Sequence, residues 1–301
     1  MQTLLLYFVL SLPLVGAYAM LGLGITVIYQ ASRVLNLAHG AMAMASAYAT
    51  YQLTRWHLPL LLAVAGGVAC GGLLGLLVER VFVRRLRAAG PTTQTVGTVA
   101  ALTASIAVAS RIWGTLPVDA PAVLPGGALH FGSGFVPWDL LGIFPIALLG
   151  GGVLFALFQF TDVGLAMRGA AQNRRGAALR GVDPDRTAML AWLLGGVLAG
   201  LAGILLAGAT SLDPFSISLG VLPAFVAALI GGLESLPGVC LGALIVGVVQ
   251  GMVPAFAQVP GVGGVLQGQG APELVLGVLA LVVMSTRGAR LAAGDVRGDS
   301  L

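Results

Sequence analysis

The chain has 301 residues, of which 58% are apolar and only 9% are charged, and its mean hydropathy is +0.99. A soluble domain carries roughly a quarter charged residues, so this composition excludes an ordinary soluble protein and predicts one that lies within a lipid bilayer. The length suits a single bundle of about eight or nine membrane spans of roughly 20 residues each, which leaves no room for a separate soluble domain.

Apolar stretches separated by polar or helix-breaking residues predict where the chain crosses the membrane. Each stretch is expected to be helical, because hydrocarbon cannot hydrogen-bond free backbone groups and the sequence lacks the alternation of a β-barrel. The predicted fold class is an all-α, polytopic transmembrane helical bundle that forms one domain over residues 1–301. In chain order the expected spans are residues 4–31, 37–53, 59–78, 94–114, 137–160, 188–210, 219–233, 238–256 and 272–286.

All 15 basic residues are Arg, and their distribution predicts the orientation of the chain. Most of them fall in residues 79–93, 161–187 and 287–301, which the positive-inside rule places on the cytoplasmic side. The connections 115–137 and 211–220 contain no Arg or Lys and are expected on the opposite side. The N-terminus would lie outside if the number of crossings is odd and inside if it is even.

The central charged segment, residues 161–187, interleaves Arg with an apolar stripe between two long spans. Its net charge is +2, five Arg against three Asp, which is lower than a polybasic lipid-binding site normally carries. Docking of a partner protein is therefore the favoured interpretation, with headgroup binding and control of topology as alternatives. Residues 79–93 carry four Arg and one Glu, which favours a role in topology and headgroup contact.

Two polar interruptions break the helical pattern at membrane depth, at residues 33–40 and 231–238. In each of them an apolar run meets Gly and polar groups and then resumes as a second apolar run. This correspondence suggests an internal repeat with a broken or re-entrant helix in each half, the arrangement in which transporters place their substrate path. The candidate path residues are Asn36, His39, Gly40, Gly231, Gly232 and Glu234.

These polar and small residues also have structural interpretations. Asn36 could cap the following helix and His39 could bond to a neighbouring helix, and this interpretation is favoured over direct contact with substrate. Glu234 is costly against lipid, so it is expected either at a cytoplasmic edge or in a wet cavity. Stripes of Gly within residues 195–203 and 238–251 allow close helix packing, either within the chain or against a second chain.

The NLAHG sequence at residues 36–40 resembles the NFAHG signature of LivH-type permeases, the membrane subunits of branched-chain amino acid ABC importers. The resemblance continues through residues 79–86, 164–182, 194–206 and 224–242, and so follows nearly the whole chain in order. Three departures stand out. Leu37 replaces the usual Phe, Glu234 stands where the family commonly has Gly, and Arg174 and Arg175 occupy positions that are often acidic or Pro.

The resemblance implies an importer permease of the bacterial inner membrane that translocates branched-chain amino acids, or a related small amino acid, urea or an amide. It also implies two ABC ATPase subunits that bind the ATP, an extracytoplasmic substrate-binding protein, and a second permease subunit of similar fold or a second copy of this chain. No cofactor of its own and no nucleic-acid partner are expected. Residues 161–187 would form the ATPase-coupling loop through Arg168, Ala170, Ala171, Gln172, Asn173, Arg174, Arg175, Gly176, Arg180 and Gly181.

Other function classes find less support in the sequence. There is no GxxxxGK[ST] loop for nucleotide phosphates, no GxSxG and no HExxH, so enzymatic activity is not expected. His39, His57 and His130 are scattered without a Cys or carboxylate at ligand spacing, so no metal site is expected. A stand-alone secondary transporter or channel for a small polar solute is the alternative. Such proteins place ionisable groups within their spans, and the spans here are nearly free of them.

Overall fold

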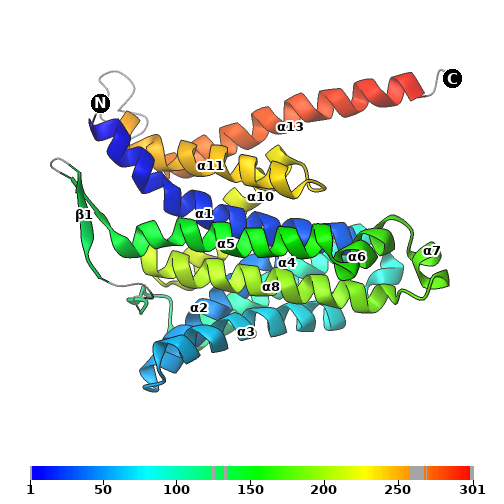
Figure 1. Ribbon diagram of the computed structural model, residues 1–301, viewed down its shortest axis with the longest axis horizontal. Coiled ribbons are helices and arrows are strands. Elements are labelled where there is room, and N and C mark those ends of the chain that lie inside the picture. Colours follow the sequence, from blue (N-terminus) through cyan, green and yellow to red (C-terminus); the bar gives the residue numbers. More distant parts are fainter. Residues whose placement is uncertain are drawn as a thin grey trace.

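The computed structural model describes residues 2–121, 123, 126–131, 134–257, 268 and 270–298. Its helices run between two ends of the molecule, and a small β-hairpin lies at one end (Figure 1). The elements are α1 (Gln2–Ser32), α2 (His39–Arg55), α3 (Leu60–Val78), η1 (Glu79–Val83), η2 (Arg87–Ala89), α4 (Pro91–Trp113), β1 (Ala128–Phe131), β2 (Gly134–Pro137), α5 (Trp138–Phe160), α6 (Asp162–Gln172), α7 (Arg174–Leu179), α8 (Pro184–Ala209), α9 (Pro214–Leu219), α10 (Val221–Gly231), α11 (Leu236–Phe256) and α13 (Ala271–Gly298).

Seven helical segments in the described part of the chain are long and apolar enough to cross a membrane. They comprise α1, α3 with η1, α4, α5, α8, the α9–α10 pair and α11. Two further segments are α2, with 17 residues, and the apolar first part of α13, Ala271–Ser285. The predicted polytopic helical bundle is confirmed, and most of its spans begin and end within a few residues of the expected positions.

The long first helix forms the centre of the bundle and packs against α5, α8, α10 and α11. Its middle is completely buried at Met20, Leu21, Ile25 and Ile28. With 31 residues it measures about 46 Å at roughly 1.5 Å per residue, more than the approximately 30 Å of a hydrocarbon core. α1 therefore extends through the whole bundle. It ends at Ser32, so the first break in the helical path lies at one end of the bundle.

Glycines let several helices touch along their backbones. A Cβ added to Gly196 of α8 would lie 2.3 Å from the carbonyl oxygen of Gly71 on α3. A Cβ added to Gly242 of α11 would lie 2.0 Å from the carbonyl oxygen of Ala227 on α10. Any larger residue would force these helices apart. Both Gly stripes therefore pack within the chain, which is the first of the two interpretations considered for them.

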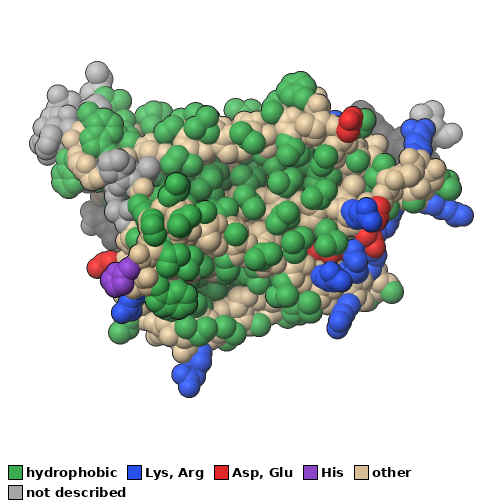
Figure 2. Space-filling view, turned by 60° about the horizontal axis from the view of Figure 1, so that its bottom comes forward, with side chains coloured by type: hydrophobic (Ala, Val, Ile, Leu, Met, Phe, Trp, Pro, Cys, Tyr) green, Lys and Arg blue, Asp and Glu red, His purple; other side chains and the backbone are tan. Residues whose placement is uncertain are grey.

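The surface divides into an apolar belt and a charged end (Figure 2). Large apolar side chains on α3, α5 and α11, among them Leu61, Leu148, Leu149, Val153 and Leu241, are between 61% and 80% exposed. Such a belt is expected to face hydrocarbon or another apolar chain. Most of the Arg side chains in view gather with acidic ones at one end (Figure 2). We call this the arginine-rich end; it carries Arg33, Arg84, Arg87, Arg174 and Arg175.

The connections contain more regular structure than the sequence predicts. Within residues 115–137, β1 and β2 pair in antiparallel fashion. Within residues 211–220, the Asp213 carboxylate accepts hydrogen bonds from the backbone N–H groups of Phe215 (3.1 Å) and Ser216 (2.9 Å) and so begins α9. Residues 287–298 of the expected tail continue α13, and 299–301 lie outside the described residues.

Candidate functional site

The first break in the helical path separates α1 from α2. α1 ends at Ser32, Arg33 has a left-handed φ of 57°, and α2 begins at His39. Thr98 of α4 holds the open backbone: its Oγ1 accepts a hydrogen bond from the Leu37 N–H at 3.1 Å and lies 3.3 Å from the Leu35 carbonyl oxygen. Backbone polar groups in a packed interior need such partners, so Thr98 fixes the shape of the break.

The candidate path residues of this break lie where α1, α2, α8 and α9 meet. His39 is completely buried, and its ring lies so close to α1 that a Cβ added to Gly24 would be 2.7 Å from the ring Nε2. A Cβ added to Gly40 would lie 2.0 Å from the carbonyl oxygen of Ser218 on α9. The small residues Gly24 and Gly40 thus leave space for the His39 imidazole and for the close approach of α2 to its neighbours.

Asn36 does not cap the next helix, contrary to one expectation. The N-cap position of α2 is Ala38, which has no side-chain cap. Asn36 is completely buried, and its Nδ2 lies 3.8 Å from the Met42 Sδ. Its Oδ1 has no hydrogen-bond partner among the described residues. A buried amide oxygen without a partner is costly, which sets this position apart as polar and unsatisfied.

The second break is a tight hairpin between α10 and α11. Gly232 has a φ of 85°, which a side chain would disfavour, and the Ser235 Oγ accepts a hydrogen bond from the Gly238 N–H at 3.1 Å. A Cβ added to Gly231 would lie 2.1 Å from the Gly238 carbonyl carbon. The predicted path residues Gly231 and Gly232 are therefore required by the hairpin itself.

An ion pair joins the two breaks. The Arg33 Nη1 donates to the Glu234 Oε1, although the two residues are 201 positions apart in the sequence. The side chains are 43% and 69% exposed, so Glu234 lies at an open edge of the bundle. That this edge is the cytoplasmic one stays a prediction. The hydrogen bond that Arg33 donates to the Glu234 carboxylate is the main reason that the pKa of Arg33 is raised above its ordinary value. An exposed pair of this kind contributes only about 0–1 kcal/mol to stability.

Residues 161–187 fold into two short helices and the start of a third at the arginine-rich end (Figure 1). The Thr161 Oγ1 accepts a hydrogen bond from the Gly164 N–H at 3.2 Å and begins α6, and the Asn173 Oδ1 accepts one from the Gly176 N–H at 2.8 Å and begins α7. Asp183 caps α8 in the same way. Three N-cap residues thus divide the segment into elements.

α6 presents one face to the bundle and the other outward. Met167 is completely buried and Ala170 nearly so, whereas Leu165 is 62% exposed and Leu179 of α7 is 84% exposed. Large apolar side chains beside charges at the end of a bundle are typical of an interaction surface. Of the other predicted coupling residues, Gln172, Asn173, Arg174, Arg175, Arg180 and Gly181 are exposed, and Arg168, Ala171 and Gly176 are half-buried.

Five charged residues connect residues 161–187 to the end of α3. Asp185 pairs with Arg87 at 2.9 Å, with Arg84 at 3.5 Å, and also with Arg174. The Glu79 Oε1 lies 3.6 Å from both the Arg84 Nε and the Arg87 Nη2. Burial and the neighbouring Arg87 lower the pKa of Arg174. We call these five residues the Glu79–Asp185 cluster. The sequence pattern alone did not reveal it, because its members are far apart in the chain.

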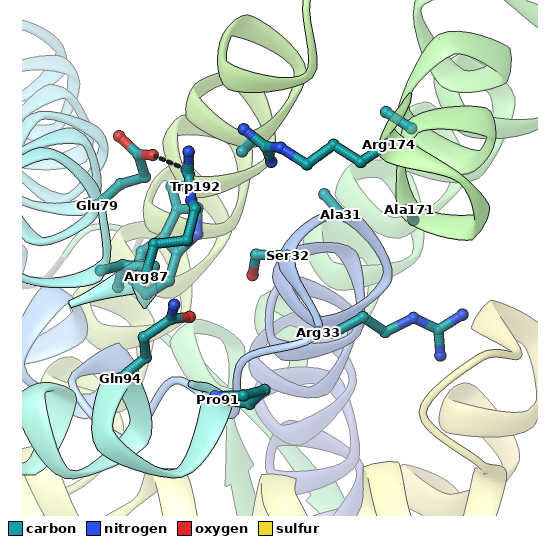
Figure 3. A pocket seen from close by; sticks show the side chains of 13 residues that line it. Ala31, Ser32, Arg33, Glu79, Arg87, Pro91, Gln94, Ala171, Arg174 and Trp192 are labelled. Atoms are coloured by element: carbon teal, nitrogen blue, oxygen red, sulfur yellow. Dashed lines mark ion pairs between the residues drawn. The ribbon is translucent and has the colours of Figure 1, made fainter. Parts of the chain in front are cut away.

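A cavity of about 260 Å³ lies beside this cluster, beneath α6 and α7. Residues from the end of α1, η1, η2, the start of α4, α6, α7 and α8 line it. In Figure 3, Glu79 is paired with Arg87 on one side of the cavity, and Arg174 reaches toward it from the opposite side. Arg33 also borders the cavity but points away from Glu79 and Arg87.

A family model described as the permease component of the branched-chain amino acid transport system matches residues 7–285. The chain belongs to this family. The resemblance to LivH-type permeases seen in the sequence is thereby confirmed, and the protein is a transport permease rather than an enzyme.

Several named proteins are similar to this permease. The high-affinity branched-chain amino acid transport system permease protein LivH of Escherichia coli (strain K12) is 24% identical over 260 residues, which cover 80% of this chain and 83% of LivH. The probable LivH of Methanocaldococcus jannaschii is 27% identical, covering 88% and 84%. The L-arabinose ABC transporter permease protein AraH of Azospirillum brasilense is 30% identical, covering 85% and 76%.

Proposed function

We propose that this permease is the membrane-spanning subunit of an ABC importer in the bacterial inner membrane, driven by two ATPase subunits that dock on α6 and α7. The observation that carries the proposal is the outward surface of these helices, where Leu165 and Leu179 lie exposed beside Arg175 and Arg180. Apolar and charged groups interleaved in this way suit a groove on a protein better than hydrocarbon.

The proposed orientation places the arginine-rich end in the cytoplasm. The positive-inside rule supports this direction, because the loops at the other end carry few basic residues. Nine helical segments that alternate in direction would put the start of α1 outside and the end of α13 inside. The β1–β2 hairpin and α9 would then face the extracytoplasmic binding protein that delivers the substrate.

The mechanism we propose is alternating access powered from the coupling helices. α6 follows directly from α5, and α7 leads into α8, so a push on these short helices moves two spans. The Glu79–Asp185 cluster extends the same displacement to the end of α3. The Arg33–Glu234 pair lies at this end and links both breaks, so the movement reaches the proposed path.

The proposed cargo is a branched-chain amino acid or a related small amino acid or amide. The LivH relatives are named for branched-chain amino acids, whereas AraH is named for L-arabinose, so similar permeases serve unlike solutes. Helix ends and free backbone groups at the two breaks can hold a zwitterion without charged side chains inside the spans. The residues proposed to line the path are Asn36, His39, Gly40, Gly231, Gly232 and Glu234, with a second permease subunit completing it.

Co-purification of the tagged chain from its native membranes tests the docking surface. The double variant Arg175→Glu and Arg180→Glu reverses two exposed charges on and next to α7. We expect the unaltered chain to bring down an ATPase, the double variant to lose it, and ATP-driven leucine uptake into vesicles to fall with it. Arg55→Glu, a charge reversal at the opposite end, is the matched control and is expected to retain both.

A different result would support the other transporter class. If the unaltered chain purifies without an ATPase and carries leucine into vesicles without ATP, the importer function is wrong and a secondary transporter replaces it. If the ATPase remains bound to the double variant, docking occurs elsewhere.

A further inference from the structure

The cavity beneath α6 and α7 has the chemistry of a binding site with two opposite ends. Its volume of about 260 Å³ is near the lower end of small-molecule pockets, which begin at roughly 300 Å³. Its wall combines the guanidinium groups of Arg87 and Arg174 with the carboxylate of Glu79. The rest of the lining includes Arg33, Gln94 and small apolar residues such as Ala31 and Ala171.

Two buried polar groups on this wall lack hydrogen-bond partners among the described residues. The Glu79 side chain is completely buried, and neither of its oxygens has one; its nearest Arg nitrogens are 3.6 Å away. The indole N–H of Trp192 is likewise completely buried and unpartnered. Unsatisfied groups of this kind are rare, and a ligand is one explanation for them. Both residues belong to the lining of the cavity, and Glu79 also keeps its ion pairs with Arg84 and Arg87.

The charged side chains beside the cavity limit which kinds of ligand can bind there. The Glu79–Asp185 cluster holds three Arg against two carboxylates. Arg87 and Arg174 both bind the Asp185 carboxylate, and a guanidinium has five N–H donors, so each keeps donors for a further acceptor. A simple anion would lie against the Glu79 carboxylate, and a simple cation would face the guanidinium groups. A zwitterionic ligand avoids both conflicts. Its carboxylate can accept hydrogen bonds from Arg87, Arg174 and the Trp192 indole, and its ammonium group can donate to Glu79.

We propose that this cavity is a binding site for a free α-amino acid, entered from the arginine-rich end and distinct from the path between the two breaks. The ammonium group lies against Glu79, the carboxylate accepts from the N–H groups of Arg87 and Arg174 that Asp185 does not use, and the side chain rests on Ala31 and Ala171. The site is beneath the coupling helices, so its occupant restrains α6 and α7. The choice of leucine as the first ligand rests on the proposed function.

Isothermal titration of the purified full chain in detergent tests this site with three ligands. We expect L-leucine to bind, and leucinamide, which lacks the carboxylate, and 4-methylpentanoate, which lacks the ammonium group, to bind about tenfold more weakly or not at all. Equal binding of all three would overturn the proposal. Phosphoethanolamine is the probe for a lipid headgroup with the same two charges, and tighter binding of this probe than of leucine would also overturn it.

Two variants test whether the ligand binds in the cavity. Glu79→Gln removes the partner of the ammonium group, and Ala171→Leu fills the space that the ligand side chain would occupy. We expect each to weaken leucine binding at least about tenfold. Arg85→Gln, an exposed charge outside the cavity lining, is the matched control and keeps full affinity. Leucine binding that survives both Glu79→Gln and Ala171→Leu would put the ligand elsewhere and overturn the proposal.

The thermal unfolding of each variant shows whether it is folded. If Glu79→Gln does not fold, Ala171→Leu alone tests whether leucine binds in the cavity. Leucine uptake by the assembled importer is measured separately. If uptake occurs and the isolated chain does not bind leucine, this inference alone fails. If the chain binds leucine at the cavity and ATP drives no uptake, the proposed function fails and this site stands.

Discussion

Single glycines set the distance between backbones at the centre of this permease. Gly40, at the start of α2, faces the last turn of α9, where even a methyl group has no space. The same position belongs to the NLAHG sequence by which the family resemblance first appears. The small size of this residue therefore has a direct packing reason, whatever part it takes in transport.

Replacing Gly40 with Ala tests this packing. The new Cβ would lie 2.0 Å from the Ser218 carbonyl oxygen, so α2 and α9 must separate, and we expect a loss of about 1–3 kcal/mol in the free energy of unfolding. Gly208→Ala is the control, because nothing lies within 4 Å of its added Cβ and Ala favours a helix by up to about 1 kcal/mol. Thermal unfolding in detergent compares the two. Equal stability of both variants would contradict the close packing of α2 against α9 at Gly40.

Residue roles were the least predictable part of the site. The sequence allowed two places for Glu234, and only the structure places it at an open edge beside Arg33. It also allowed Asn36 to cap a helix, a role that the structure does not give it. Thr98 was not singled out at all, because a Thr within an apolar span gives no sign of the backbone groups that it meets. Such contacts depend on the packing of distant helices.

At the scale of elements, the sequence predicted the spans well because each is a long apolar run with polar ends. α9 was missed because six residues are too few for a hydropathy pattern; the available signal was Asp213 followed by Pro214, an N-cap with Pro at the first helical position. The charged segment 161–187 stands out in the sequence by its Arg residues, but its division into α6 and α7 depends on Thr161 and Asn173 as caps.

Asp185→Asn tests whether the Glu79–Asp185 cluster restrains the coupling helices. The change removes the charge that Arg84, Arg87 and Arg174 share, and we expect a local loss of about 1 kcal/mol because the group is partly exposed. Amide hydrogen exchange in residues 162–181 should then become roughly fivefold faster. Asp162→Asn, on the same segment and outside the cluster, should leave the exchange rates nearly unchanged. Unaltered exchange in Asp185→Asn would mean that the cluster does not hold α6 and α7.

For the whole molecule, composition alone indicated a membrane bundle, and the Arg distribution indicated that three segments share one end. The structure agrees for residues 79–93 and 161–187, which meet in the Glu79–Asp185 cluster. What the sequence could not provide is the pairing itself, since helices in lipid associate through small residues that recur on almost every span here. The proposed internal repeat stays a prediction.

Labelling of single cysteines tests the proposed orientation. In a background with Cys70→Ala and Cys240→Ala, a membrane-impermeant maleimide should label Leu116→Cys in intact cells, because this residue is 78% exposed at the end opposite the arginine-rich end. Leu179→Cys, 84% exposed on α7, should react only after the membrane is permeabilised. The reverse pattern would invert the orientation and place the coupling helices outside the cell.

The glycine contacts also divide the bundle into parts that move together and parts that can bend. Where backbone touches backbone, as at Gly196 with Gly71, Gly203 with Ala43, and Gly242 with Ala227, a slide of one residue, about 1.5 Å, would drive a neighbouring Cβ into the opposite chain. α2, α3 and α8 are therefore held together as one unit and α10 and α11 as another, and α1 touches both units in the same way, at Gly24 with Gly195 and at Val15 with Gly247. A change of shape that keeps these units intact would bend at short non-helical joints outside them, such as residues 33–38 and 173.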